Sequence, residues 1–430
     1  MNKKRSAFSG KIGYVLSAAG ASVGLGNIWR FPYLAAKYGG GIFLLVYIIL
    51  ALTFGYTMIV AESALGRMTR KSPVGAFRSF AKGKKVGWLS FGGWINAIIP
   101  VLIVPYYSVI GGWVVKYLFE YIRGNGSKLA EDGYFSGFIS NGGATEICFV
   151  IFCMFTLVII YAGVQNGIER VSKIMMPILV VLSVIIAIYS VTRPGAIEGV
   201  KYFLVPNVKN FSWMTVVAAM GQMFYSLSIA MGILVTFGSY MRKDTSIEDS
   251  TRNVEIFDTA IAMMAGLMII PAVFAFSGGD PDTLQAGPSL MFITIPKVFA
   301  NMGFGTAVGI LFFVLVLFAA VTSSIALTES AVSTFEDELG WGRKKATVLT
   351  GVIMITLGTL SCLGYGPLDF VKIIGMQFLD FFDFLTNSVM MPIAALMTSL
   401  LVSRVIGVDK IEEEIRHGAV SYTHLTLPTN

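Results

Sequence analysis

Ten long apolar segments alternate with short polar intervals along the chain. Each segment is close to or above the roughly 20 residues that a helix needs to cross the hydrocarbon core of a bilayer. We therefore expect an all-α polytopic membrane protein with one spanning helix per segment. The predicted spans are 12–36, 41–66, 87–122, 147–164, 168–192, 212–240, 253–276, 306–335, 345–363 and 371–404.

The first apolar segment contains small and polar residues where a spanning helix should be continuous. Gly20, Gly24 and Gly26 each cost about 1 kcal/mol of helix propensity relative to alanine, and Asn27 and Arg30 add polar groups. In lipid, an opened backbone is tolerated only where it is buried in protein or lines a wet cavity. We interpret the segment as a helix broken at mid-membrane, with free backbone groups facing an ion or ligand. The alternative is a close-packed kink, because glycines also let helices approach closely.

The sixth segment, 212–240, has a similar interruption between Gly221 and Gly232. Segments one and six start on opposite sides of the membrane, so the two halves of the chain form an inverted repeat of five helices each. We place repeat one at about 10–192 and repeat two at about 210–405. Interrupted spans in matching positions are typical of transporters with a site at mid-membrane.

The composition agrees with this class, since 55% of the residues are hydrophobic, 13% are charged and the mean hydropathy is +0.74. The two histidines, His417 and His424, follow the last span, so no span carries a Ser–His pair or an HExxH zinc motif. We expect a protein that is not an enzyme and uses no organic cofactor. Residues 1–420 are predicted to form a single transmembrane transporter domain, and 421–430, which match nothing before them, a non-native tail.

Positive charge predicts the orientation. With the N-terminus in the cytoplasm, 22 of the 32 Lys and Arg residues lie on the inner side. The net charge of +7 is therefore attributed to topology and not to a nucleic-acid partner. We expect a multi-pass protein of the cell (inner) membrane, bounded by lipid.

The interval between spans seven and eight is the longest one that still looks structured. It contains Gly278–Asp282 and then an apolar run, 287–296, that is too short to cross the membrane. We expect a loop that dips back onto the outer mouth.

Short motifs stand out along the chain: Val23–Pro32 with Gly39–Gly41, Gly221–Gln222 with Ser226–Ser228, Arg242–Asp244, Thr322–Ser324 and Glu336–Leu339. Taken together, they resemble the neurotransmitter:sodium symporter family, in its bacterial amino-acid transporter branch. The similarity runs from about residue 5 to 417. It implies the five-plus-five inverted-repeat transporter fold with broken helices 1 and 6, and sodium-coupled uptake of a small amine or amino acid. Family members usually have eleven or twelve helices, and the sequence predicts ten here.

The resemblance implies two sodium sites. The first takes the carbonyl of Ser22, the side chains of Asn27, Ser226 and Asp258, and the substrate carboxylate. The second takes the carbonyls of Gly20, Val23 and Ala319 with the hydroxyls of Thr322 and Ser323. The alternative for these hydroxyls is a hydrogen bond back to the carbonyl four residues earlier, which is common in membrane helices.

Asp258 departs from the family pattern, because many members have Asn at this position. The serine that binds chloride in animal members is replaced by Ala262, although Tyr47, Gln222 and Ser226 keep part of the chloride pattern. We expect Asp258 to supply the negative charge itself, as a sodium ligand or a protonatable group, and transport to be chloride-independent. The alternative is a carboxylate that points to the cytoplasmic end of its helix.

Gly24 indicates the substrate class. Monoamine carriers of the family have Asp here to meet a substrate without a carboxylate, so Gly24 implies an α-amino acid that brings its own. Free N–H groups at the start of the second half-helix would meet that carboxylate. An apolar pocket with an adaptable Met231 suits a hydrophobic or aromatic side chain. The expected substrate-binding residues are Ser22, Gly24, Leu25, Gly26, Ile103, Tyr107, Tyr225, Ser226, Ser228, Met231, Ser324 and Leu327.

The resemblance also implies a gate at each mouth of the site. The outer gate would pair Arg30 with Asp383, or with Asp380 as the fallback, above Tyr225. The inner gate would pair Arg5 with Asp337, with Tyr240 behind the pair. Ordinary surface charge is the alternative for Arg5 and Asp337.

Two other functions use the same features. A sodium-dependent amino-acid sensor or binding protein without transport needs the same site, and only flux separates it from a carrier. A channel is disfavoured because no repeated carbonyl filter or ring of charges is visible. The identity of the amino acid, the ion stoichiometry and the oligomeric state stay open.

Overall fold

The computed structural model describes residues 5–81, 87–278 and 287–417. The described residues form helices and turns and contain no β-strand, only two isolated β-bridges. The helices are α1 (Lys11–Ser22), α2 (Phe31–Lys37), α3 (Gly41–Leu50), α4 (Tyr56–Thr69), α5 (Pro73–Ala81), α6 (Ser90–Ile122), α7 (Gly126–Leu129), α8 (Tyr134–Ser140), α9 (Gly142–Ala162), α10 (Arg170–Val191), α11 (Ala196–Leu204), α12 (Trp213–Ser226), α13 (Ile233–Tyr240), α14 (Ile247–Ser277), α15 (Ile295–Ala300), α16 (Gly305–Leu339), α17 (Arg343–Leu363), α18 (Phe378–Asp383), α19 (Met391–Leu400) and α20 (Val408–His417).

The ten predicted spans are all present. Eight are uninterrupted helical runs, long and apolar enough to cross a membrane within the described part of the chain. The other two are α1 with α2 and α12 with α13, each divided near its middle. The eight runs are Gly41–Thr69, Gly87–Ile122, Gly142–Ala162, Val164–Val191, Ile247–Ser277, Gly305–Leu339, Arg343–Leu363 and Phe378–Ile406.

Several span boundaries differ from the prediction by a few residues, and two of these differences have a clear local cause. The fourth span begins at Gly142 and not at 147, because the Asn141 side chain caps it by accepting a hydrogen bond from the Ala144 N–H (3.1 Å). The tenth begins at Phe378 and not at 371. Ile374 and Gly375 just before it have φ of 53° and 77°, a left-handed conformation that a right-handed helix cannot include.

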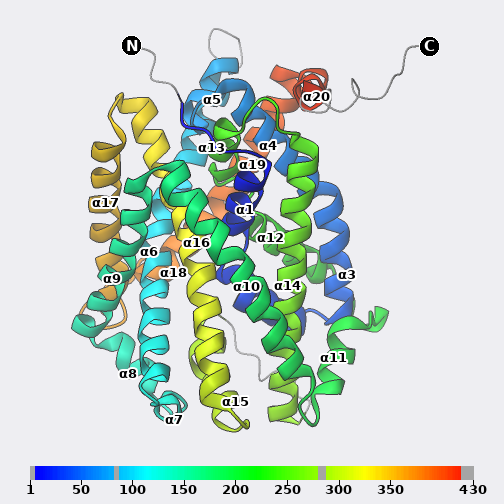
Figure 1. Ribbon diagram of the computed structural model, residues 1–430, viewed down its shortest axis with the longest axis vertical. Coiled ribbons are helices and arrows are strands. Elements are labelled where there is room, and N and C mark those ends of the chain that lie inside the picture. Colours follow the sequence, from blue (N-terminus) through cyan, green and yellow to red (C-terminus); the bar gives the residue numbers. More distant parts are fainter. Residues whose placement is uncertain (1–4, 82–86, 279–286, 418–430) are drawn as a thin grey trace.

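Figure 1 shows α1 in the middle of the bundle, surrounded by the long helices α6, α10, α14 and α16. The helices α5 and α20 lie together at one end, and α7, α8 and α15 lie at the other. An ion pair between the fully buried Arg67 of α4 and Glu414 of α20 (2.5 Å) holds α20 against the first of these ends. Because the long helices surround α1, the break that follows α1 is enclosed by protein and not by lipid.

The interval before α15 is only partly described, since 279–286 lie outside the described residues. Its apolar part is a short helical stretch, Leu290–Ala300, with Leu290, Met291 and Phe292 buried. The Tyr117 hydroxyl donates a hydrogen bond to the Phe292 carbonyl (2.8 Å) and attaches the stretch to α6. The tail at 421–430 also lies outside the described residues.

Candidate functional site

The first break separates α1 from the continuation of its span. Val23 and Gly24 are not helical, and helical turns resume at Leu25. A Cβ atom at Gly24 would lie 2.5 Å from the Ser323 Oγ and 3.0 Å from the Tyr107 hydroxyl. The backbone thus approaches α6 and α16 more closely than any other residue type permits, so the break is a packed feature of the fold.

The second break covers the residues between α12 and α13. Ser228, Ala230 and Gly232 have φ of 55°, 59° and 70°, which is strained for the two that carry a side chain. The Ser228 hydroxyl donates a hydrogen bond to the Ala21 carbonyl (3.2 Å), so the two broken segments contact each other directly.

Glu62 of α4 holds the second break and was not among the predicted site residues. The Ala230 N–H donates to its Oε1 (2.9 Å), and the carboxylate is fully buried. The signal was present in the sequence, because an ionisable residue inside an apolar span is by default functional. Which backbone it meets could not be read from the sequence.

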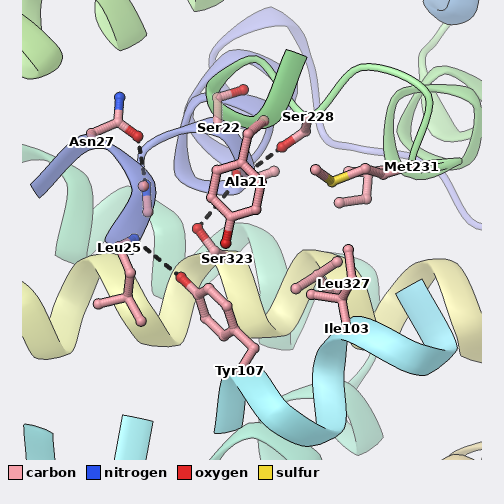
Figure 2. A pocket seen from close by; sticks show the side chains of 14 residues that line it. Ala21, Ser22, Leu25, Asn27, Ile103, Tyr107, Ser228, Met231, Ser323 and Leu327 are labelled. Carbon is pink, nitrogen blue, oxygen red and sulfur yellow. Dashed lines mark hydrogen bonds between the residues drawn. The ribbon is translucent and has the colours of Figure 1, made fainter. Parts of the chain in front are cut away.

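A small cavity lies between the two breaks (Figure 2). Ten of the twelve predicted substrate-binding residues line it. Ser226 and Ser324 do not: the Ser226 hydroxyl contacts Asp258, and the Ser324 hydroxyl accepts a hydrogen bond from Thr156 (3.3 Å). The lining residues are Ala21, Ser22, Gly24, Leu25, Gly26, Asn27, Ile103, Tyr107, Tyr225, Ser228, Met231, Ile233, Ser323 and Leu327.

The cavity has a polar side and an apolar side. On the polar side, the Leu25 N–H donates to the Tyr107 hydroxyl at 3.2 Å. In Figure 2, Ile103, Met231 and Leu327 gather away from this hydrogen bond. The arrangement suits a ligand with a small anionic group at one end and an apolar body.

The predicted first sodium site contains a buried hydrogen-bonded cluster centred on Asp258. The Asn27 Nδ2 donates to the Asp258 Oδ1 (2.8 Å) and to the Ser226 Oγ (3.0 Å). The Ser226 hydroxyl lies 2.9 and 3.0 Å from the two Asp258 oxygens, and the Tyr47 hydroxyl donates to Oδ2 (3.2 Å). Asp258 is fully buried and faces the first break, so it does not point to the end of α14. The Asp258 carboxylate and the hydroxyls of Ser226 and Tyr47 are oxygen donors that suit a hard cation. Asn27 turns its Nδ2 toward them, and its Oδ1 accepts a hydrogen bond from the Gly24 N–H (3.2 Å).

The predicted second sodium site lies where α16 meets the end of α1. The Ser323 Oγ is 3.3 Å from the Gly20 carbonyl oxygen and 3.3 Å from that of Val23. The Thr322 hydroxyl donates back to the Phe318 carbonyl (2.9 Å) and lies 3.2 Å from the Ala319 carbonyl oxygen. Thr322 thus makes the ordinary bond within its helix, whereas Ser323 reaches across to the broken one. The donors are uncharged oxygens, a set compatible with a monovalent hard cation.

The inner gate residues are in contact. The Arg5 Nη1 lies 2.6 Å from the Asp337 Oδ1, and Nη2 donates to the Ser333 hydroxyl (2.6 Å). The guanidinium also lies over the Tyr240 ring, 5.0 Å from its centroid. Arg5 therefore joins the N-terminal segment to α16 and α13.

The outer gate residues are arranged differently. The Arg30 guanidinium lies over the Tyr225 ring, 5.0 Å from its centroid. Among the described residues, Arg30 forms no ion pair with Asp383 or Asp380. Asp383 instead accepts hydrogen bonds from Tyr106 (3.1 Å) and Asn387 (2.7 Å). The inner pair is formed in this structure and the outer pair is not.

Comparison with known proteins adds independent evidence. The sequence profile of the "Sodium:neurotransmitter symporter family" matches residues 5–127 and 134–426. An "uncharacterized sodium-dependent transporter YhdH" of Bacillus subtilis is 36% identical, with 96% of this chain and 90% of the relative covered. An "uncharacterized sodium-dependent transporter" of Haemophilus influenzae is 33% identical, with 96% and 92% covered.

A solved structure gives the same picture. MhsT, crystallised in complex with L-phenylalanine, superposes with a TM-score of 0.86 and 37% sequence identity, covering 96% of this chain and 93% of that one. The match confirms the predicted inverted-repeat transporter fold with broken helices 1 and 6.

Proposed function

Because the chain belongs to the sodium:neurotransmitter symporter family, whose members are sodium-coupled transporters and not enzymes, we propose that it takes up a hydrophobic or aromatic α-amino acid together with sodium by alternating access. Its sodium dependence and its multi-pass membrane location follow from the family and the spans. We propose in addition the type of substrate, the residues of the ion sites, the direction of transport and the orientation of the chain in the membrane.

The cavity at the two breaks carries the proposal. None of the described residues that line it has a charged side chain, yet it offers the Leu25 N–H and the Tyr107 hydroxyl at one end. A bound zwitterion must therefore bring its own carboxylate, which those donors and a sodium ion in the first site would meet. Its ammonium group would meet backbone carbonyls at the ends of α1 and α12.

The apolar side of the cavity supports a large side chain. Ile103, Met231 and Leu327 supply branched or flexible apolar surface, and methionine adapts to different shapes. MhsT was crystallised with L-phenylalanine, which fits the same expectation for this chain. Leucine, methionine, tryptophan and tyrosine belong in the panel to be tested.

Two sodium ions give the coupling a physical basis. In the first site, near Asn27 and Asp258, the substrate carboxylate completes the ligand set, so amino acid and ion stabilise each other's binding. In the second site, Ser323 links α16 to the carbonyls at the end of α1. Occupation of both sites would favour the closed inner side in which Arg5 contacts Asp337, and release would follow when that contact opens.

We also propose that transport does not require chloride and that the N-terminus is cytoplasmic. Asp258 would supply the negative charge of the first site itself, as a sodium ligand or a protonatable group, so no chloride ion would be needed to balance the sodium charge. The excess of basic residues at their end of the bundle supports a cytoplasmic position for the N-terminus, α5 and α20.

The decisive experiment is equilibrium binding of a labelled amino-acid panel to the purified protein in sodium and in potassium. Binding of one large apolar amino acid only in sodium, lost in Asn27→Ala, supports the coupled site. Sodium-driven uptake into vesicles, unchanged when gluconate replaces chloride, then distinguishes a carrier from a sensor. Binding that ignores sodium would rule out the ion assignments.

A further inference from the structure

A second, separate and shallow groove opens between α9 and α17. The two helices pack against each other at the left margin of the bundle in Figure 1. The groove lies at the start of α17, which is the end of the bundle that carries α5 and α20. Its main residues are Tyr161, Trp341, Lys344, Lys345, Val348 and Val352.

The groove carries two unneutralised positive charges. Lys344 and Lys345 are both exposed, and no carboxylate lies within 4.0 Å of either ammonium group in the part of the chain that the structure describes. The neighbouring Arg343 differs, because its guanidinium pairs with the buried Glu329 at 2.5 Å. The two lysines thus have charge available for a ligand, whereas the charge of Arg343 is neutralised by the buried Glu329.

The rest of the groove has the polarity of a bilayer boundary. Trp341 and Tyr161 are half-exposed, as is typical of aromatic residues at headgroup depth, and the Lys344 Nζ lies 5.5 Å from the centroid of the Tyr161 ring. Val348 and Val352 are 62% and 57% exposed and lie one turn apart on the same face of α17. Along α17 the charge at 344–345 comes before the apolar surface of Val348 and Val352, which is the order of a phospholipid's headgroup and acyl chain, and the aromatic rings of Trp341 and Tyr161 flank the charged end.

We propose that this groove is a binding site for one anionic phospholipid of the adjacent leaflet. Its phosphate groups contact Lys344 and Lys345, its glycerol region packs against Trp341 and Tyr161, and one acyl chain follows Val348 and Val352. Charge complementarity selects an anionic lipid over a zwitterionic one, because a zwitterionic headgroup carries its own cation beside the phosphate. Two surface lysines give a preference on the order of tenfold.

Trp341 provides the reporter. The full chain is reconstituted in phosphatidylcholine vesicles containing increasing fractions of phosphatidylglycerol, with bromine atoms on the acyl chains of one lipid at a time. The quenching lost in Trp341→Phe isolates this residue from the other five tryptophans. We expect brominated phosphatidylglycerol to quench Trp341 at a fraction about tenfold lower than brominated phosphatidylcholine.

The double variant K344Q/K345Q should remove this preference, and K344R/K345R should keep it. The matched control is K243Q/K410Q, since Lys243 and Lys410 are also exposed, and the structure shows no carboxylate partner for them among the described residues. The control should retain the full preference. Thermal melting checks folding, and if K344Q/K345Q does not fold, the single variants should each show a reduced preference. Equal quenching by the two lipids in the parent, or an unchanged preference in K344Q/K345Q, would overturn the proposal.

Discussion

The side chains of Asn27 and Asp258 are in hydrogen-bond contact at 2.8 Å, although 231 residues of sequence separate them. One lies at the first break and the other in the middle of α14. The contact places the only carboxylate side chain among the predicted sodium ligands against the broken helix. The first prediction therefore concerns the charge of Asp258.

Asp258→Asn keeps the shape and most hydrogen bonds of the cluster but removes its charge. We expect the sodium concentration for half-maximal binding to rise on the order of tenfold or more, because a buried carboxylate attracts a nearby cation strongly. Amino-acid affinity at saturating sodium should change far less. Titration of amino-acid binding with sodium measures both. The control is Glu255→Gln, a buried carboxylate one turn away that forms no hydrogen bond with Asn27 among the described residues, which should leave the titration within twofold.

Gly24→Ala tests the close approach at the first break. Its Cβ would lie 2.5 Å from the Ser323 Oγ and 3.0 Å from the Tyr107 hydroxyl, so both of these side chains must shift from their present contacts. We expect amino-acid affinity to fall at least tenfold, roughly 1.4 kcal/mol or more. Gly221→Ala is the matched control, because a Cβ there meets no atom within 4 Å. Equal binding by both variants would show that the approach is not needed.

Ser323 and Ser324 are adjacent in sequence, and a comparison of the two tests the predicted second sodium site. Ser323→Ala removes the hydroxyl that reaches the carbonyls of Gly20 and Val23, and should raise the sodium requirement about tenfold, as expected for one bond to a charged group. Ser324→Ala should change it less than twofold, since that hydroxyl contacts Thr156 outside the cavity. Sodium titrations of the two variants give the comparison. Similar effects in both would contradict the geometry.

The inner gate can be weakened from one side. Arg5→Ala removes a partly buried ion pair with Asp337 and should shift the protein toward an inward-open state by about 2 kcal/mol, roughly 30-fold. Labelling of a cysteine introduced at Ser333 from the cytoplasmic side reports the shift, in a background without the three native cysteines. The control is Lys11→Ala, whose pair with Asp249 is exposed and contributes little. Unchanged labelling in Arg5→Ala would contradict a gate at this contact.

Glu62 is predicted to stabilise the second break. Glu62→Ala leaves the buried Ala230 N–H without its acceptor and should lower the free energy of unfolding by about 1–3 kcal/mol. Glu62→Gln keeps an acceptor oxygen and should retain most of the stability. Thermal unfolding in detergent, with and without amino acid and sodium, compares the two. A Gln variant as unstable as the Ala variant would indicate that the charge, and not the hydrogen bond, matters.

The sequence by itself determined the membrane class, the number of spans and the positions of both breaks. It could do so because lipid imposes a fixed length on each apolar segment and makes interruptions in it conspicuous. The motif resemblance added the family and named residues that the structure brings around one cavity, among them Leu25, Tyr107 and Met231.

Only the tertiary structure decided which neighbour each side chain meets. In a helix, Ser323 and Ser324 differ by about 100° in direction, and the packing of α16 against α1 and α9 turns one to the broken helix and the other to Thr156. The contact of Glu62 with Ala230 depends on how α4 crosses the second break, which no local pattern records. The same holds for Arg30, because the position of Asp383 relative to α2 depends on how the two halves of the bundle are packed.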